Sequence, residues 1–250
     1  MKIMEQNTSK KHDLQNLTVG ELAAEDYRKA EVFKKFGIDF CCGGNKLLEK
    51  ACHDKNIESQ DVITALNQLN DVQNKSDMNF NRWELDKLAD YIVDKHHSYI
   101  SKAVPVLNFY LNKVSSVHGD DHPNTLEIFS HFIQLSGELN LHMLKEEDVL
   151  FPFINKLVEA AKTQQVIHAP FGSVEGPIRM MIMEHEAAGN ELESIRTLSD
   201  FYSPPEDACT TFKVTYAKLK EFEEDLKFHI HLENNILFPK ALALAKIYLQ

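Results

Sequence analysis

One eleven-residue pattern occurs twice in this chain and constrains its fold more than any other feature. Residues 142–152 read HMLKEEDVLFP, and residues 229–239 read HIHLENNILFP. Both segments have the frame H-x3-E-x3-L-F-P, and they lie 229 − 142 = 87 residues apart. A match at all five positions of this frame indicates an internal repeat. We therefore expect the two segments to be equivalent parts of duplicated halves.

A pair of histidines outside the pattern has almost the same separation. His97 and His185 are 185 − 97 = 88 residues apart, and the spacing within each half also agrees, since 142 − 97 = 45 and 229 − 185 = 44. Residues i and i+4 of a helix lie on one face, so each H-x3-E directs its histidine and its glutamate into the same space. The spacing thus selects six metal-ligand candidates: His97, His142, Glu146, His185, His229 and Glu233.

The chemistry of these six side chains favours two metal ions. Imidazole and carboxylate suit first-row cations, and four nitrogens with two carboxylates exceed what one tetrahedral zinc can use. A carboxylate has two oxygens and can bridge two metals, which leaves two histidines for each ion. Iron is preferred because this ligand set matches di-iron sites inside four-helix bundles, while the spacing leaves manganese open. The Glu-x-x-His of ferritin-like sites and the H-E-x-x-H of zinc proteases are absent from the sequence.

Long amphipathic segments with few breaks predict an all-α protein. The chain has only 9 glycines and 8 prolines in 250 residues, and we find no convincing strand. An antiparallel four-helix bundle is expected over residues 83–248. Its predicted helices cover residues 85–118, 124–162, 178–199 and 206–247.

The N-terminal part is predicted to form a separate small helical domain, residues 14–69, joined to the bundle by a polar linker, residues 70–82. Thr18 and Glu21 have the spacing of a capping box, and the helix that they begin is expected to continue to a stop at Gly37. Two shorter helices are expected after it.

The turn Cys41-Cys42-Gly43-Gly44 is a second candidate site. The glycines allow a tight turn, and we expect the positive end of the following helix to favour thiolates. Because a disulfide between adjacent cysteines is strained, Cys41 and Cys42 are interpreted as a candidate thiol relay or metal-holding pair. The alternative is two small apolar side chains buried in a turn.

The other cysteines and several histidines have no partner at a matching spacing. Cys52 could join the vicinal pair, and Cys209 is interpreted as structural. Surface or packing roles are expected for His96, His118, His122, His131, His168 and His231. His231 should face away from the metal site, because residues i and i+2 diverge on a helix.

Charge and targeting signals exclude some classes of protein. The chain has 27 basic and 38 acidic residues, a net charge of −11, which disfavours binding to nucleic acid. The first residues contain no signal core, and no apolar stretch approaches the roughly 18 residues of a membrane span. We therefore expect a cytoplasmic protein without a membrane partner, and its four cysteines are too few for a disulfide scaffold.

Together these motifs resemble the hemerythrin-like superfamily. The closer resemblance is to the Repair of Iron Centres proteins, which carry an N-terminal CCGG (ScdA-type) domain. It rests on Phe40 followed by Cys41 to Gly44, on the two H-x3-E motifs with a single histidine before each, and on residues 204–211 and 229–235. These segments are spread over most of the chain.

The resemblance implies a non-haem di-iron centre in a hemerythrin-like bundle. His97, His142, His185 and His229 would be terminal ligands, and Glu146 and Glu233 would bridge the irons together with an oxo or hydroxo group. It also implies repair of iron–sulfur clusters damaged by nitrosative or oxidative stress, by iron donation to damaged iron–sulfur proteins. An enzyme that binds or reduces nitric oxide or O₂, or a sensor of these gases, is the alternative. A homodimer, the client and the electron donor stay open.

Overall fold

The computed structural model describes residues 14–70, 79–170 and 172–250. Every regular element within these ranges is a helix, which confirms the expected all-α class. Internal contacts divide the chain into two compact units, residues 1–77 and residues 78–250. Most of the predicted linker, residues 71–78, lies outside the described residues.

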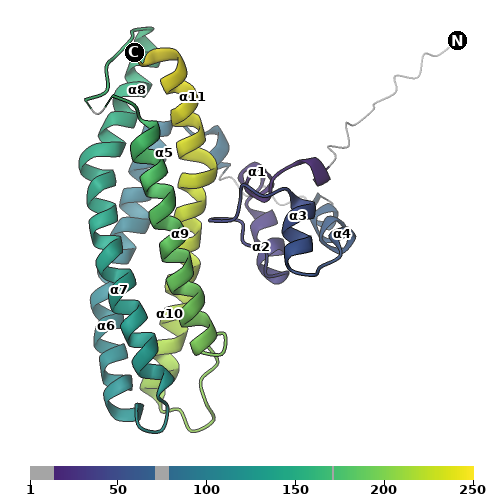
Figure 1. The fold of residues 1–250 in the computed structure, drawn as a ribbon, viewed down its shortest axis with the longest axis vertical. Coiled ribbons are helices and arrows are strands. Elements are labelled where there is room, and N and C mark those ends of the chain that lie inside the picture. The colour runs from purple at the N-terminus through teal and green to yellow at the C-terminus, as the bar shows by residue number, and fades with distance from the viewer. Residues whose placement is uncertain (1–13, 71–78, 171) are drawn as a thin grey trace, which may run out of the picture. The chain divides into compact units, whose positions relative to one another are not determined.

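The larger unit is a bundle of four rods, each antiparallel to the one before it in the chain (Figure 1). Three rods contain a short π-helical segment between two α-helices. Their elements are α5 (Leu85–Tyr91), η3 (Ile92–His97) and α6 (Ser98–His118); α7 (Asn124–Lys145), η4 (Glu146–Leu150) and α8 (Phe151–Thr163); and α10 (Thr210–Leu232), η5 (Glu233–Leu237) and α11 (Phe238–Tyr248). The third rod in the chain is one uninterrupted helix, α9 (Glu175–Leu198).

Prolines account for the largest shifts between predicted and observed helix ends. Helix α9 begins at Glu175 rather than at 178, because Pro177 lies in the first turn, where no backbone N–H is needed. Helix α10 begins at Thr210 rather than at 206. The preceding residues form a turn in which Ala208 N donates to Pro205 O at 3.0 Å, and Cys209 is the N-cap.

The residues just before the first rod belong to the bundle, which corrects the predicted end of the linker. Phe80 lies in the short 3₁₀ helix η2 (Phe80–Arg82) and is only 5% exposed. Its ring centroid lies 5.6 Å from that of Phe228 on α10 and 4.9 Å from that of Trp83. Burial of this aromatic side chain attaches residues 80–82 to the bundle core.

Over residues 14–70, the described part of the N-terminal unit, a short 3₁₀ helix, η1 (Leu14–Asn16), and four α-helices surround a small core. The helices are α1 (Val19–Glu25), α2 (Arg28–Lys35), α3 (Leu48–Asp54) and α4 (Ser59–Asn70). The core contains the fully buried side chains of Leu22, Phe33, Leu48, Val62 and Leu66.

The beginning of this unit follows the prediction only in part. The capping box is present, with Glu21 N donating to the Thr18 hydroxyl and Thr18 N donating to the Glu21 carboxylate. The predicted single helix is instead broken at Asp26, whose carboxylate accepts from the backbone N–H of Arg28 at 3.0 Å and also pairs with its guanidinium. Because the Arg28 N–H bonds to the Asp26 side chain rather than to a backbone carbonyl, the first helix ends there and a second helix, α2, begins at Arg28. Gly37, at φ +66°, then ends α2 as expected.

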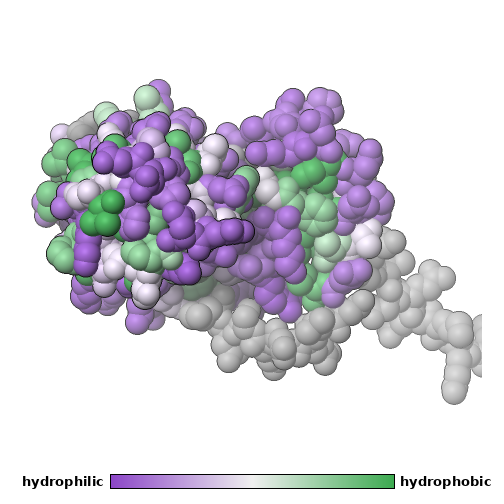
Figure 2. Space-filling model, turned by 90° about the horizontal axis from the view of Figure 1, so that it is seen from below, coloured by the Kyte–Doolittle hydropathy of each residue, from purple (hydrophilic) through white to green (hydrophobic). Residues whose placement is uncertain are grey.

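The exposed surface is mainly polar. In the face drawn in Figure 2, hydrophilic residues predominate and hydrophobic residues form small separate patches. Among the described residues, none of the helices combines the length and the apolar character that crossing a membrane requires.

Candidate metal centre

The structure brings the six selected side chains together in the bundle interior, where each is at most 2% exposed. They form two groups in which the potential ligand atoms all lie within 4.8 Å of one another. We call them the His97–His229 position and the His142–His185 position. Glu146 and Glu233 belong to both groups. All four rods therefore contribute to one connected site.

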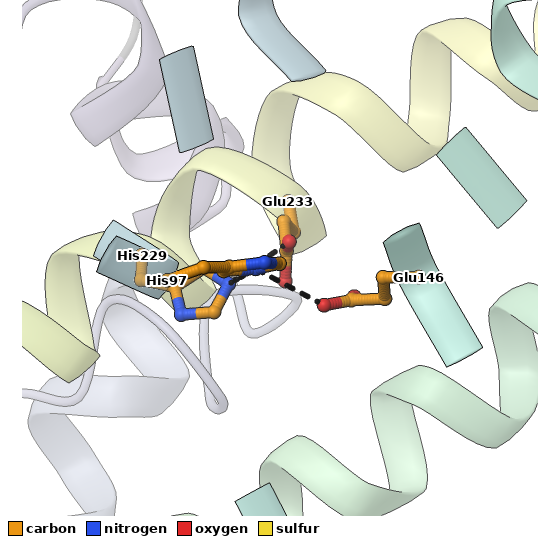
Figure 3. A group of neighbouring side chains, drawn as sticks. All are labelled: His97, Glu146, His229 and Glu233. Atoms are coloured by element: carbon orange, nitrogen blue, oxygen red, sulfur yellow. Dashed lines mark hydrogen bonds and ion pairs between the residues drawn. The ribbon is translucent and has the colours of Figure 1, made fainter. Parts of the chain in front are cut away.

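The two positions have similar internal geometry. In the His97–His229 position the two Nε2 atoms are 3.3 Å apart, and Glu146 and Glu233 oxygens lie 3.4 and 3.0 Å from them. Figure 3 shows these four side chains pointing toward one another; His229 and Glu233 come from one rod, and His97 and Glu146 from two others. In the His142–His185 position the Nε2 atoms are 3.0 Å apart, with carboxylate oxygens at 3.3 and 3.0 Å.

The tautomers of three histidines show that a cation suits this arrangement. His97 donates through Nδ1 to Glu147 Oε1 at 2.7 Å. His142 and His185 donate through Nδ1 to Glu184 Oε2 and Asn234 Oδ1, each at 2.9 Å. A neutral imidazole that donates through Nδ1 has only a lone pair at Nε2. The facing Nε2 atoms of His142 and His185 therefore require a proton or a metal ion.

Buried carboxylate oxygens lead to the same conclusion. Glu146 and Glu233 are 0% exposed, and Glu146 Oε1 and Oε2 and Glu233 Oε2 face histidine Nε2 atoms at 3.0–3.4 Å without forming a hydrogen bond. A buried carboxylate without hydrogen bonds is costly unless an opposite charge or a metal ion compensates it. Imidazole nitrogens and carboxylate oxygens together form a ligand set for a first-row cation.

The buried carboxylates raise the proton affinity of two of the ligand histidines. Burial lowers the pKa of His142, but the Glu146 carboxylate and its neighbours outweigh this and raise that pKa to about 9. The pKa of His97 is also raised, because Glu146 outweighs burial. The nearby histidines lower the pKa of Glu146 and of Glu233 against the effect of burial. A metal ion entering this cluster must therefore displace protons.

The π-helical segments are located at the ligands. Segment η3 ends at His97, η4 begins at Glu146, and η5 begins at Glu233. Single π turns within α-helices are frequent at functional sites. In the two repeated segments the following proline, Pro152 or Pro239, lacks the N–H that would bond to the carbonyl four residues earlier. The repeated L-F-P was thus a sequence signal for η4 and η5, whereas nothing in the sequence explains η3.

The phenylalanines of the repeat form part of the wall of the site. The Phe151 ring stacks on His97 with centroids 5.8 Å apart, and the Phe238 ring stacks on His185 at 6.0 Å. Both phenylalanines are buried. They exclude water and hold two of the imidazole rings in orientation.

The six histidines for which surface or packing roles are expected lie outside the two groups. His231 is buried, and its ring bonds to Asn235, so it faces away from the ligands as expected. His96 is also buried and contacts Asp225 through Nδ1 at 3.0 Å. The others contact polar groups elsewhere: His118 with Cys209, His122 with Asp207, His131 with Glu191 and His168 with the carbonyl of Gln250.

Sequence reasoning missed the side chains that orient the ligand histidines. Glu147, Glu184 and Asn234 accept from imidazole Nδ1 atoms across the bundle. Each is adjacent in sequence to one of the six candidate ligands, and this adjacency was the only signal available.

The vicinal cysteines lie in a turn organised by a carboxylate. Asp39 accepts the backbone N–H groups of Cys41, Cys42 and Gly43 at 3.0, 3.1 and 2.8 Å. The Cys41 thiol also contacts Asp39 at 3.1 Å, and the two sulfur atoms are 3.9 Å apart without a disulfide. Asp39, Cys41 and Cys42 form a third group that could hold a metal ion. Cys52 is not in that group but is buried in α3.

The expectation of a favoured thiolate is wrong for Cys41. Its pKa is raised, because it bonds to Cys42, is buried and lies beside the Asp39 carboxylate. The following helix, α3, begins only at Leu48, and the groups donating at the turn face Asp39 rather than sulfur. The Cys42 thiol, burial and the Asp39 carboxylate therefore act together to raise this pKa, and no helix N-terminus offsets them.

Replacing Asp39 with asparagine tests this account. The variant keeps an acceptor for the turn but removes the charge, so the pKa of Cys41 should fall and more thiolate should be present at a given pH. The rate of alkylation of Cys41, followed against pH by mass spectrometry, should have its midpoint at lower pH than in the native chain. An unchanged or higher midpoint would contradict the assignment. Glu49→Gln on α3 is a control with the same loss of charge.

Comparison with known proteins agrees with this architecture. Residues 88–241 match the family described as hemerythrin HHE cation binding domain, and residues 15–70 match the ScdA N-terminal family, described as a domain of unknown function. A probable iron-sulfur cluster repair protein of Haemophilus influenzae is 34% identical over 90% of this chain and 96% of its own length. The iron-sulfur cluster repair protein YtfE of Musicola paradisiaca is 36% identical over 90% and 96%.

The chain belongs to the hemerythrin-like iron–sulfur cluster repair family. A further member, YtfE of Yersinia pseudotuberculosis, is 33% identical over 92% of this chain and 98% of its own length. Both the family and the helical-bundle fold expected from the sequence are confirmed. The matched cation-binding domain contains all six clustered side chains.

Proposed function

We propose that this chain repairs iron–sulfur clusters damaged by nitrosative or oxidative stress, as a donor of iron. Two iron ions would be held, one by His97 and His229 and one by His142 and His185. Glu146 and Glu233 would bridge them. The observation that carries the proposal is that both glutamates belong to both ligand groups.

The arrangement of buried charge supports two ions rather than one. The Glu146 and Glu233 carboxylates share one buried site, and the charge of Glu233 acts to raise the pKa of Glu146. Two cations between them would remove this repulsion and engage the oxygens that lack hydrogen bonds. Two imidazoles then remain for each ion.

The same ligands suit release as well as storage. Bound iron would supply the atoms that a damaged cluster has lost. Imidazole and carboxylate ligands compete with protons, and they hold a divalent ion less tightly than a trivalent one. The neighbouring carboxylates hold the pKa of His142 near 9, so a proton is readily accepted there when the metal leaves.

The vicinal cysteines Cys41 and Cys42 have a role of their own in the proposal. Thiolates are the ligands that iron–sulfur clusters prefer. With Asp39 they form a small group of three potential ligands in the N-terminal unit. We assign to this pair the reception of released iron or the contact with the damaged client.

The test is iron transfer to a client enzyme whose cluster has been damaged with nitric oxide. The native chain, loaded with isotopically labelled iron, should restore client activity and transfer the label without added iron. The variant Glu146→Leu/Glu233→Leu should do neither. Equal repair by both proteins would overturn the donor proposal. Turnover of nitric oxide by the reduced chain alone, without repair, would favour the gas-reducing alternative.

A further inference from the structure

The four ligand histidines differ at the nitrogen that faces away from the metal site. Nδ1 of His97, His142 and His185 donates to Glu147, Glu184 and Asn234 respectively. Nδ1 of His229 is buried without any hydrogen-bond partner, although the residue is 0% exposed. One ligand of four therefore lacks an orienting partner.

The internal repeat explains where this partner would be. Glu147 and Asn234 occupy equivalent positions in the two repeats, since 234 − 147 = 87. Each accepts from Nδ1 of the histidine on the preceding rod, Glu147 from His97 and Asn234 from His185. Glu184 accepts from Nδ1 of His142. Its equivalent position in the other repeat is residue 96, since 184 − 96 = 88, the same offset that separates His97 from His185. Residue 96 is a histidine, so the half that contains His229 has no carboxylate at that place.

His96 does not replace the missing carboxylate. Its ring lies parallel to that of His229, with centroids 5.9 Å apart and planes 10° apart. Its Nδ1 contacts Asp225 at 3.0 Å, and its Nε2 is buried without a hydrogen-bond partner. The Asp225 carboxylate thus orients His96, whereas His229 has polar contacts at Nε2, with Glu233 and His97, but no partner at Nδ1.

We propose that the two metal positions bind unequally, and that the metal at the His97–His229 position leaves first. An outer partner at a ligand histidine fixes its ring and increases its basicity, and loss of one such partner typically lowers metal affinity by about 10–100-fold. The His142–His185 position has two partners, Glu184 and Asn234, whereas the His97–His229 position has only Glu147. The inference rests on the proposed binding of two irons and specifies their order of release.

An ordered release gives the donor two distinct states. The first ion passes to a client while the second keeps Glu146 and Glu233 neutralised. The bundle then retains a compensated core after one donation, because the buried carboxylates are not left without a cation.

The test measures both positions in the reduced, iron-loaded full chain. Release to a ferrous chelator should occur in two phases of equal amplitude, with rates separated by about 10–100-fold. Crystals exposed briefly to the chelator should show, by anomalous diffraction at the iron edge, loss of occupancy between His97 and His229. Parallel loss at both positions, or earlier loss between His142 and His185, would overturn the inference.

Two variants extend the test. Glu184→Gln weakens the partner of His142 and should accelerate the slow phase; Glu184 is partly exposed, so the fold should tolerate the change. His96→Glu restores the equivalent carboxylate and should slow the fast phase. Glu191→Gln removes a carboxylate from His131, outside the site, and should change neither phase. An unchanged slow phase in Glu184→Gln would count against the role of the outer partners.

Failure of the inference can be distinguished from failure of the proposed function. If the native chain binds two irons and repairs its client but loses both ions in parallel, only the order of release is wrong. If the chain does not bind two irons, the proposed centre itself is wrong, whatever the kinetics.

Discussion

Replacing Glu146 with leucine is expected to remove metal from both positions, although only one side chain changes. Glu146 belongs to both ligand groups and is completely buried. Elemental analysis should find the iron content of the variant reduced at least tenfold, in line with the loss of a direct ligand. For the native chain, metal at a thousandfold excess over its Kd should add about 4 kcal/mol to the free energy of unfolding, and the variant should lose this increment.

Thermal unfolding with and without added ferrous iron measures this increment. Glu159→Leu is the matched control, because Glu159 is exposed on the same rod and has no ligand role. That variant should keep the native iron content and the native rise in Tm. Retention of one iron per chain by Glu146→Leu would show that this carboxylate serves a single position, and would contradict the shared site.

Replacing Phe238 with alanine should destabilise the metal-free bundle by about 3–5 kcal/mol. Phe238 is 1% exposed, so its removal leaves a cavity in the core. Its ring also stacks on His185, so the same change should loosen that ligand and weaken metal binding at the His142–His185 position. Denaturant unfolding of the metal-free chain should show a lower midpoint with an unchanged m-value.

The control for this cavity is Phe109→Ala. Phe109 lies on α6 and is 65% exposed, so the same substitution should change the free energy of unfolding by no more than about 0.5 kcal/mol. Equal losses in the two variants would mean that Phe238 does not contribute as a core residue. Loss of stability in Phe238→Ala with unchanged metal affinity would separate its packing role from its contact with His185.

The sequence alone was sufficient to predict the bundle and to select the six clustered side chains. Their selection depended on the spacing between the repeated segments and on the i, i+4 relation within a helix, both of which are local or periodic. The structure brings all six together. The first part of the N-terminal unit was predicted less well, because the side chain of Asp26 competes with the helix for the N–H of Arg28.

The cysteine turn shows where local reasoning failed. The sequence places Cys41 ahead of a helix and suggests a thiolate, but the Cys42 thiol, burial and the Asp39 carboxylate raise the pKa of Cys41. Asp39 is only two residues away, yet its carboxylate reaches the thiol because the turn folds back on it. The direction of a pKa shift depends on such distances and on burial, which composition does not reveal.

The sequence by itself determined which residues are duplicated, which helices carry them and which face of each helix they share. Only the tertiary structure decided which histidines pair at each position, which carboxylates are shared, and which imidazole nitrogens have partners. These contacts between rods join side chains that are 42 to 132 residues apart in the chain, as in His142 with Glu184 and His97 with His229. They depend on how each rod is rotated about its axis and shifted along it. The packing of the bundle determines both, and local sequence spacing does not encode them.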